Sequence, residues 1–295
     1  MKPPTNPNIL NTTTRPEPTT TASADEPGWY LYGVTFADIA SRLAASPSLG
    51  NGAPLLALEQ DGLAALARLV PRHTFSAAAI QERAHDIGWL EETVRNHNLV
   101  VERIHQLGPV LPAKFGSIYS DSGILQASLA ETHDALFARL MWLQGCDEWG
   151  VHVYADRQAL QRATTEDPTL KQMQADIASA GPGRAYLLKR KLADAIADIS
   201  GAALATLAQT SYQHLADYAV AGQRNPASLR PASAGAECEL LYASFLVQRA
   251  VADDFLLAAQ RLVQEQEGLR CEYSGPWPPY SFASADGADG KEDHE

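Results

Sequence analysis

The pattern of hydrophobic and polar positions changes period several times between residues 29 and 119 and predicts a mixed α+β domain. Aromatic and β-branched runs indicate strands, whereas apolar residues three and four positions apart indicate helices. The predicted elements are a strand at 29–36, a helix at 38–45, strands at 54–60 and 63–70, a helix at 76–107 and a strand at 110–119. This β-α-β-β-α-β order is that of the ferredoxin-like fold.

Asp61-Gly62 is predicted to join the two middle strands, because both residues tolerate the positive φ that a two-residue hairpin turn requires. The Ala/Leu-rich segment 63–69 also fits a helix, so the pattern alone leaves two assignments for it. An added helix at about 120–144 and an added strand at 148–154 complete a first domain that we expect to span residues 29–156.

The second half of the chain predicts another α+β domain, at residues 182–283. Its expected elements are a long helix at 184–218, a strand at 240–247, a helix at 251–267 and a half-buried strand at 269–274. They contain a βαβ unit, so a second ferredoxin-like or related domain is plausible, and the two halves could be distant versions of each other. Residues 157–181 are interpreted as the connection, since Asp167-Pro168 and Gly181-Pro182-Gly183 interrupt regular structure.

Both ends of the chain have compositions typical of disorder. Residues 1–28 are rich in Thr and Pro, and residues 284–295 are rich in Gly and acidic side chains. We therefore predict a disordered N-terminal arm and a disordered acidic tail outside the two domains.

The composition narrows the class of partner. Lys and Arg number 23 against 35 Asp and Glu, a net charge of −12, which is repelled by phosphate backbones and by anionic membranes. No segment approaches the roughly 18 apolar residues of a membrane span, and the N-terminus lacks the pattern of a signal peptide. Three widely spaced cysteines predict reduced thiols. We expect a cytoplasmic protein that binds neither nucleic acid nor membranes.

Motifs for chemistry are scarce. The histidines show no helical pair three or four residues apart that would bind a metal. His97 and His133 fall on apolar helix stripes and are interpreted as hydrogen-bonded core residues. Gly181-Pro182-Gly183 lacks the further residues of a phosphate-binding loop, so it is interpreted as a helix start. The sequence predicts no catalytic, cofactor-binding or metal-binding residue.

Three features are candidates for binding a protein partner. They are Lys114 and Phe115 where the chain re-enters the sheet after the long helix, the basic cluster Arg184, Lys189, Arg190 and Lys191, and Trp277 and Tyr280 in a proline-rich strap. Each has a plainer interpretation. The basic cluster is also typical of a solvated helix face, and the rings of the strap could pack on the protein's own domains.

Several distinctive segments, in this order, resemble the gas vesicle protein family GvpF/GvpL. They are Trp29–Val34, Trp89–Glu92 with Val94 and His97-Asn98, Gly108–Gly116, Glu148–Val151, Gly183–Leu188 and Gly275–Phe282. The resemblance covers roughly residues 29–283. Lys114 stands where the resemblance leads us to expect an arginine, which keeps the charge but not the bidentate pairing.

The resemblance implies a non-enzymatic role. Such a protein would bind the hydrophobic shell protein GvpA, limit its aggregation and assist nucleation of the gas vesicle, with other gas vesicle accessory proteins as further candidate partners. It also implies two α+β domains, the first ferredoxin-like, and it carries over no catalytic residue and no cofactor. The location would be the gas vesicle within the cytoplasm.

Two alternatives remain open at this point. Ferredoxin-like domains also build enzymes and small-ligand sensors, and a generic interaction adaptor would need no shell protein. The sequence does not distinguish the F subtype from the L subtype.

Overall fold

The computed structural model describes residues 27–44, 54–75, 77–83, 85–156, 159, 164–225, 237–266 and 268–284. The predicted arm at 1–28 and tail at 284–295 lie almost wholly outside these residues, as does part of the predicted connection at 157–181. The chain divides into two compact units, a first unit of residues 1–148 with 276–295 and a second unit of residues 149–275. The domain borders predicted from sequence stay a prediction.

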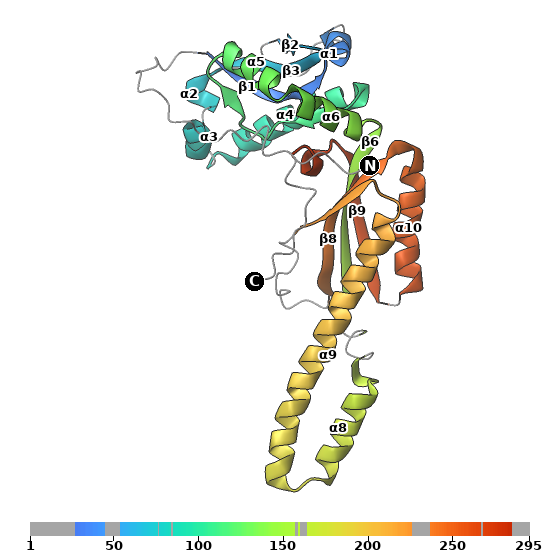
Figure 1. Ribbon diagram of the computed structural model, residues 1–295. Coiled ribbons are helices and arrows are strands. Elements are labelled where there is room, and N and C mark those ends of the chain that lie inside the picture. The colour runs from blue at the N-terminus through green and yellow to red at the C-terminus, as the bar shows by residue number, and fades with distance from the viewer. Residues whose placement is uncertain are drawn as a thin grey trace. The chain divides into compact units, whose positions relative to one another are not determined.

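The first unit is built on an antiparallel sheet with β1 in its interior (Figure 1). The strands are β1 (Pro27–Phe36), β2 (Leu56–Gln60), β3 (Leu63–Pro71), β4 (Val110–Pro112) and β5 (Ile118–Tyr119). Their order is β2-β3-β1-β4, and β5 pairs with the beginning of β1. The predicted β-α-β-β-α-β succession is therefore present up to β4, while the ferredoxin-like assignment stays a prediction.

The hairpin between β2 and β3 has the predicted turn. Asp61 and Gly62 adopt φ values of 49° and 85°, the left-handed conformation that a tight hairpin needs. Leu63–Ala67 form the buried part of β3, so the helical alternative for this segment is wrong. The pattern was ambiguous because these five residues are buried on both faces of the sheet, which removes the alternation.

The helices of the first unit are α1 (Ala37–Ala44), α2 (Arg72–Phe75), α3 (Ala77–Arg83), α4 (Ile87–Leu107), α5 (Ser122–Glu131) and α6 (His133–Leu143). In this unit, α1 matches the helix predicted at 38–45 to within one residue, whereas the segments predicted at 76–107 and 120–144 are each divided into shorter helices. Asp86 begins α4 by accepting a hydrogen bond from the Trp89 amide at 3.1 Å, which divides the helix predicted at 76–107. The helix predicted at 120–144 is divided at Thr132, whose hydroxyl donates to the Ser128 carbonyl.

The core of the first unit lies between its sheet and the helices α1 and α4. Its buried members are Tyr30, Tyr32, Ile39, Ala40, Leu43, Ala64, Leu66, Val100, Val101, Ile104 and Val110. Val100, Val101 and Ile104 recur on one face of α4, as the helical spacing of apolar residues predicts.

The second unit is built on the sheet β7-β8-β6-β9. The strands are β6 (Cys146–Asp156), β7 (Ala221–Arg224), β8 (Glu237–Gln248) and β9 (Leu269–Trp277). The strand predicted at 148–154 corresponds to β6, which pairs inside this second sheet, whereas the sequence analysis placed it with the first domain. Taken in chain order, both sheets arrange their first four strands as second, third, first, fourth, and the predicted α+β class is confirmed.

The helices of the second unit are α8 (Pro168–Ser179), α9 (Pro182–Ala216) and α10 (Ala252–Glu265), with short 3-10 turns η2 (Arg249–Val251) before α10 and, in the first unit, η3 (Tyr280–Phe282). The connection predicted at 157–181 thus contains a helix. Asp167-Pro168 is its start, since the Asp167 side chain accepts from the amides of Thr169 and Leu170 and proline fits the first turn.

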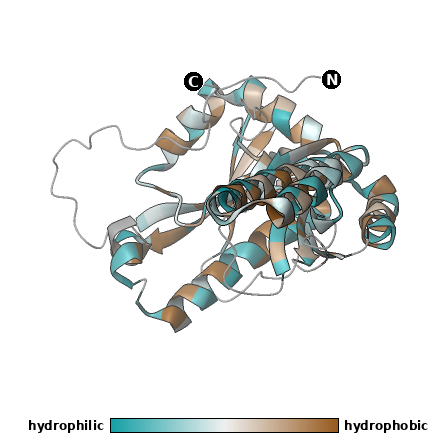
Figure 2. Cartoon of the chain, turned by 90° about the horizontal axis from the view of Figure 1, so that it is seen from below, coloured by the Kyte–Doolittle hydropathy of each residue, from teal (hydrophilic) through white to brown (hydrophobic). Residues whose placement is uncertain are grey.

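The core of the second unit lies between its sheet and the helices α9 and α10. Phe245 and Phe255 are fully buried there, together with Val151 and Val153 of β6. From Leu204 onward, α9 contributes to this core, whereas its first half packs along α8 and continues past the sheet. We call α8 with residues 182–203 the helical arm. Hydrophobic and hydrophilic residues are mixed along these helices, and none of the helices in the described part of the chain could cross a membrane (Figure 2).

Candidate partner-binding site

Lys114 and Phe115 lie in a tight turn that interrupts the strand predicted at 110–119. The Ser117 amide and hydroxyl both donate to the Lys114 carbonyl, at 3.1 and 2.7 Å. Gly116 has φ +85°, the conformation that such a turn assigns to glycine at its third position. The turn leaves Lys114 exposed and Phe115 half-buried, so this pair reaches the surface of the first unit on a fixed backbone.

A buried network holds this turn. The Gly116 amide donates to the Tyr30 hydroxyl, the Tyr30 hydroxyl donates to Nδ1 of His97 at 3.0 Å, and Nε2 of His97 donates to the Ala113 carbonyl at 3.2 Å. Phe115 packs edge-on against the rings of Tyr30 and His97. His97 is 3% exposed and burial lowers its pKa to about 4, which keeps the imidazole neutral.

The predicted role as a hydrogen-bonded core residue is found for one of the two histidines on the apolar stripes and not for the other. His97 is the hydrogen-bonded core residue that the spacing predicts. For His133 the core prediction is wrong, because its ring is partly exposed and bonds to Asp134 and to the Asp61 carbonyl. The side chain of His133 points to the hairpin turn at Asp61 rather than to the centre of the core.

The C-terminal strap lies against the same unit. Gly275–Trp277 continue β9 at the edge of its sheet, where a proline is tolerated. Pro278 and Pro279 are buried, and Phe282, 2% exposed, packs against Trp142. Trp277 is 46% exposed and Tyr280 38% exposed. Phe282 thus packs against the protein itself, whereas Trp277 and Tyr280 expose part of their rings to solvent.

Glu148 anchors this strap. Its carboxylate is 8% exposed and accepts from the Ser281 amide at 2.8 Å and from the Ser281 hydroxyl at 2.6 Å. The Tyr280 hydroxyl donates to Oδ1 of Asn98 on α4 at 3.1 Å. Neither Glu148 nor Asn98 was predicted as a site residue, although both stand in the segments that carry the family resemblance.

We expect that Glu148→Ala releases the strap. Hydrogen bonds to a buried carboxylate contribute about 1.5–3 kcal/mol, so exchange of the Ser281 amide should accelerate roughly ten- to a hundredfold. Hydrogen exchange with mass spectrometry of peptides covering residues 278–284 measures this exchange rate. Glu131→Ala, at an exposed position of α5, is the control. Unchanged exchange in a folded Glu148→Ala protein would show that the anchor lies elsewhere.

An open depression of about 520 Å³ runs along α4 beside the strap. It is lined by Leu90, Glu91, Val94, Arg95, Asn98, Leu99 and Glu102. Leu99 is half-exposed, and Asn98 is also the residue that receives the Tyr280 hydroxyl. His97 and Asn98, which are adjacent on α4, therefore bring the turn and the strap to one helix, with a depression of mixed apolar and charged lining next to them.

The basic cluster belongs to the second unit. Arg184, Lys189, Arg190 and Lys191 are all exposed on the first turns of α9, in the helical arm of the second unit. The predicted residues thus form two sets, one in each unit. We call Lys114, Phe115, Trp277, Tyr280 and the α4 depression the strap surface.

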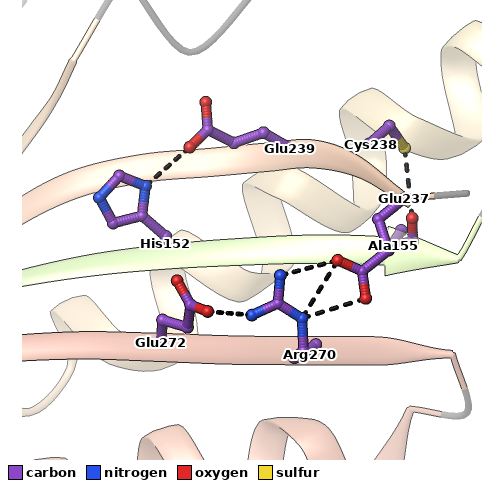
Figure 3. A network of polar contacts seen from close by, with 7 residues as sticks. All are labelled: His152, Ala155, Glu237, Cys238, Glu239, Arg270 and Glu272. Atoms are coloured by element: carbon purple, nitrogen blue, oxygen red, sulfur yellow. Dashed lines mark hydrogen bonds and ion pairs between the residues drawn. The ribbon is translucent and has the colours of Figure 1, made fainter. Parts of the chain in front are cut away.

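A further polar network covers the face of the second sheet that is turned away from α9 and α10 (Figure 3). Arg270 pairs with Glu237 at 2.7 Å and also with Glu272. Nδ1 of His152 donates to the Glu239 carboxylate at 2.7 Å, and the His152 ring stacks on Tyr242 with ring centres 4.1 Å apart. Alternation at 269–274 indicated the polar face, but only the sheet order shows which charges pair.

This network offers charge pairing rather than an open reactive group, since each of its charged side chains has a bonded partner. Within the described residues, no group of three or more His, Cys, Asp and Glu has a metal-binding arrangement. The three cysteines are free, and burial raises the pKa of the Cys271 thiol to about 11.

Comparison with known proteins places this architecture in a family. The family described as "Gas vesicle synthesis protein GvpL/GvpF" matches residues 28–284, which is most of the chain. The chain belongs to the GvpL/GvpF family. The match includes the turn, α4, the helical arm and the strap, and it confirms the resemblance seen in the sequence.

The similar proteins include some named gas vesicle protein L and some named gas vesicle protein F. Gas vesicle protein L of Streptomyces sp. (strain CB03234) is 29% identical over 86% of this chain and 92% of its own length. Gas vesicle protein F of the same strain is also 29% identical, over 70% of this chain and 83% of its own length. Gas vesicle protein L2 of Halobacterium salinarum is 29% identical over 68% of this chain and 74% of its own.

Two crystal structures of GvpF have the same fold. GvpF from Anabaena sp. PCC7120 matches 88% of this chain and 98% of its own with a TM-score of 0.65 at 18% identity. GvpF from Microcystis aeruginosa matches 87% of this chain and 99% of its own with a TM-score of 0.54 at 17% identity. The GvpL/GvpF family is one of gas vesicle proteins, so a part in gas vesicle assembly is the function class of this chain.

Proposed function

We propose that this protein binds a GvpA-type gas vesicle shell protein, limits its aggregation and assists nucleation and assembly of the vesicle. Family membership supports the process. The observation that carries the binding step is the strap surface, which combines two exposed aromatic rings with a depression on α4 whose lining includes Leu90, Val94 and Leu99. Fixed aromatic side chains lose little conformational entropy on binding and are frequent anchors of interfaces.

The charge of the chain fits this role. A small apolar, β-rich shell subunit exposes strand edges that self-associate before ordered growth. A partner with a net charge of −12 that covers those edges keeps the complex dispersed by electrostatic repulsion. Lys114, exposed beside Phe115, adds a positive charge at the proposed contact itself. Other gas vesicle components are further partners under this proposal, at the gas vesicle in the cytoplasm.

The strap surface is tested by Trp277→Ala combined with Tyr280→Ala. Loss of two interface anchors typically weakens binding by tenfold or more, so we expect the soluble fraction of co-expressed GvpA to fall severalfold. The soluble fraction is measured by centrifugation and quantitative immunoblotting.

The matched control is Tyr273→Ala, which removes a comparably exposed ring, 44% exposed, from the second unit. Circular dichroism establishes that each variant is folded. Soluble GvpA at the wild-type level with a folded double variant would exclude the strap surface from the binding site. Loss with Tyr273→Ala alone would move the binding site to the second unit.

A further inference from the structure

The helical arm of the second unit has one covered face and one open face. Along the first half of α9, half-buried residues recur at positions 185, 188, 192, 195 and 199, a single helical stripe, and α8 packs along this part of the helix. The opposite side of α9 is exposed throughout. It carries Tyr186, 74% exposed, and Leu187, 62% exposed, together with small and charged residues.

Charge is segregated along the exposed positions of this half of α9, with Arg190 and Asp194 opposite the half-buried stripe and Lys189 and Lys191 on its two flanks. Residues 182–191 contain four basic side chains and no acidic one, whereas residues 192–203 contain Asp194 and Asp198 and no basic one. At 1.5 Å per residue, the centres of the two groups lie about 11 Å apart along the helix. No ion pair joins Lys189, Arg190 or Lys191 to either aspartate among the described residues. Both charged groups therefore remain available to a partner.

Such a face is complementary to a second copy of itself turned end for end. A two-fold axis makes one patch contact the identical patch, with each contact made twice. If that axis passes close to Ala193, the basic segment of each α9 faces the aspartates of the other. The small side chains of Ala193 and Ala197 would allow the two helices to approach closely.

We propose that two copies of this chain associate through antiparallel packing of the open faces of α9. Lys191 and Arg190 of each copy then pair with Asp194 of the other, and Tyr186 and Leu187 cover the ends of the contact. A different partner could use the basic segment alone, but it would leave the adjacent aspartates facing a surface of the wrong sign. The segregation of both signs on one helix face favours the second copy.

The test uses two variants of the full chain with opposite charge reversals. The acidic-arm variant carries Lys189→Glu, Arg190→Glu and Lys191→Glu, and the basic-arm variant carries Asp194→Lys and Asp198→Lys. Sedimentation velocity at about 100 µM populates an interface with a micromolar Kd. We expect dimers for the wild type. For each variant alone we expect a dissociation constant at least about tenfold higher and a shift toward monomer, because like charges then face each other.

Mixing the two variants is the decisive measurement. In the mixed pair every reversed charge again meets its opposite, so dimers should return although neither variant forms them alone. Recovery on mixing also shows that both variants are folded, which circular dichroism checks independently. A monomeric wild type, variants that dimerise like wild type, or a mixture without recovery would each overturn the proposal. Loss of GvpA solubility with the acidic-arm variant and no recovery on mixing would assign the basic cluster to shell-protein binding instead.

Discussion

Replacement of Phe255 by alanine is expected to lower the free energy of unfolding of the second unit by about 3–5 kcal/mol. Phe255 is fully buried on α10, where its ring contacts Phe245 at 5.5 Å and Trp149 at 6.4 Å between centres. Truncation removes the transfer free energy of the ring and leaves a cavity between helix and sheet. The surrounding rings belong to β6 and β8, which cannot close that cavity without breaking strand pairing.

Urea unfolding followed by circular dichroism measures this loss. The matched control is Leu257→Ala on the same helix, since Leu257 is 47% exposed and its truncation should cost well under about 1 kcal/mol. Equal losses for the two variants would contradict the assignment of Phe255 to the centre of the second core.

Acidification is expected to destabilise the first unit through His97. Its pKa is about 4 in the folded chain against 6.5 for an ordinary histidine, because burial disfavours the charged ring. The stabilisation is complete above pH 6.5 and is lost as the pH falls from 6.5 toward 4. At 1.36 kcal/mol per pKa unit, this histidine accounts for a loss of about 3 kcal/mol across that range.

His97→Gln isolates this contribution. Glutamine can both donate and accept, so it can retain contacts to Tyr30 and Ala113, but it does not titrate. We expect the fall in unfolding free energy between pH 6.5 and pH 4 to be smaller in the variant than in the wild type by about 3 kcal/mol. Urea unfolding at a series of pH values gives the comparison.

His133 supplies a control of opposite sign. Its hydrogen bond to Asp134 raises its pKa, so its contribution is present at low pH and is lost as the pH rises. His133→Gln should therefore leave the acid-induced loss in place. Identical pH profiles for wild type and His97→Gln would show that the buried network around Tyr30 does not depend on a neutral imidazole.

The candidate site illustrates how far sequence reasoning reached. Lys114, Phe115, Trp277 and Tyr280 were found because prolines and aromatic residues cluster around them, and this composition is visible without a structure. Glu148 was missed as an anchor, since its partner Ser281 lies 133 residues away in the chain. No local sequence signal distinguishes a buried, hydrogen-bonded carboxylate near a strand from a solvated one.

The order and type of the elements were likewise predicted in part from local pattern and decided in part only by the structure. The strand around Trp149 was predicted as a strand and placed with the first domain, whereas β6 pairs in the second sheet, because periodicity reports burial and not the identity of the neighbouring strand. Asp167-Pro168 was interpreted as an interruption of regular structure, although the same two residues also suit a helix start. The structure shows the helix start, since α8 begins there.

The sequence by itself determined the α+β class, the hairpin at Asp61-Gly62, the long helix α9, the net negative charge and the resemblance to the GvpF/GvpL family. These features depend on local conformational preference, on composition or on segments that can be recognised in order. Only the tertiary structure decided which strands share a sheet, that α4 brings the turn and the strap together, and that α9 has an open face. Those features depend on contacts between residues far apart in the chain, whose free energy no local pattern encodes.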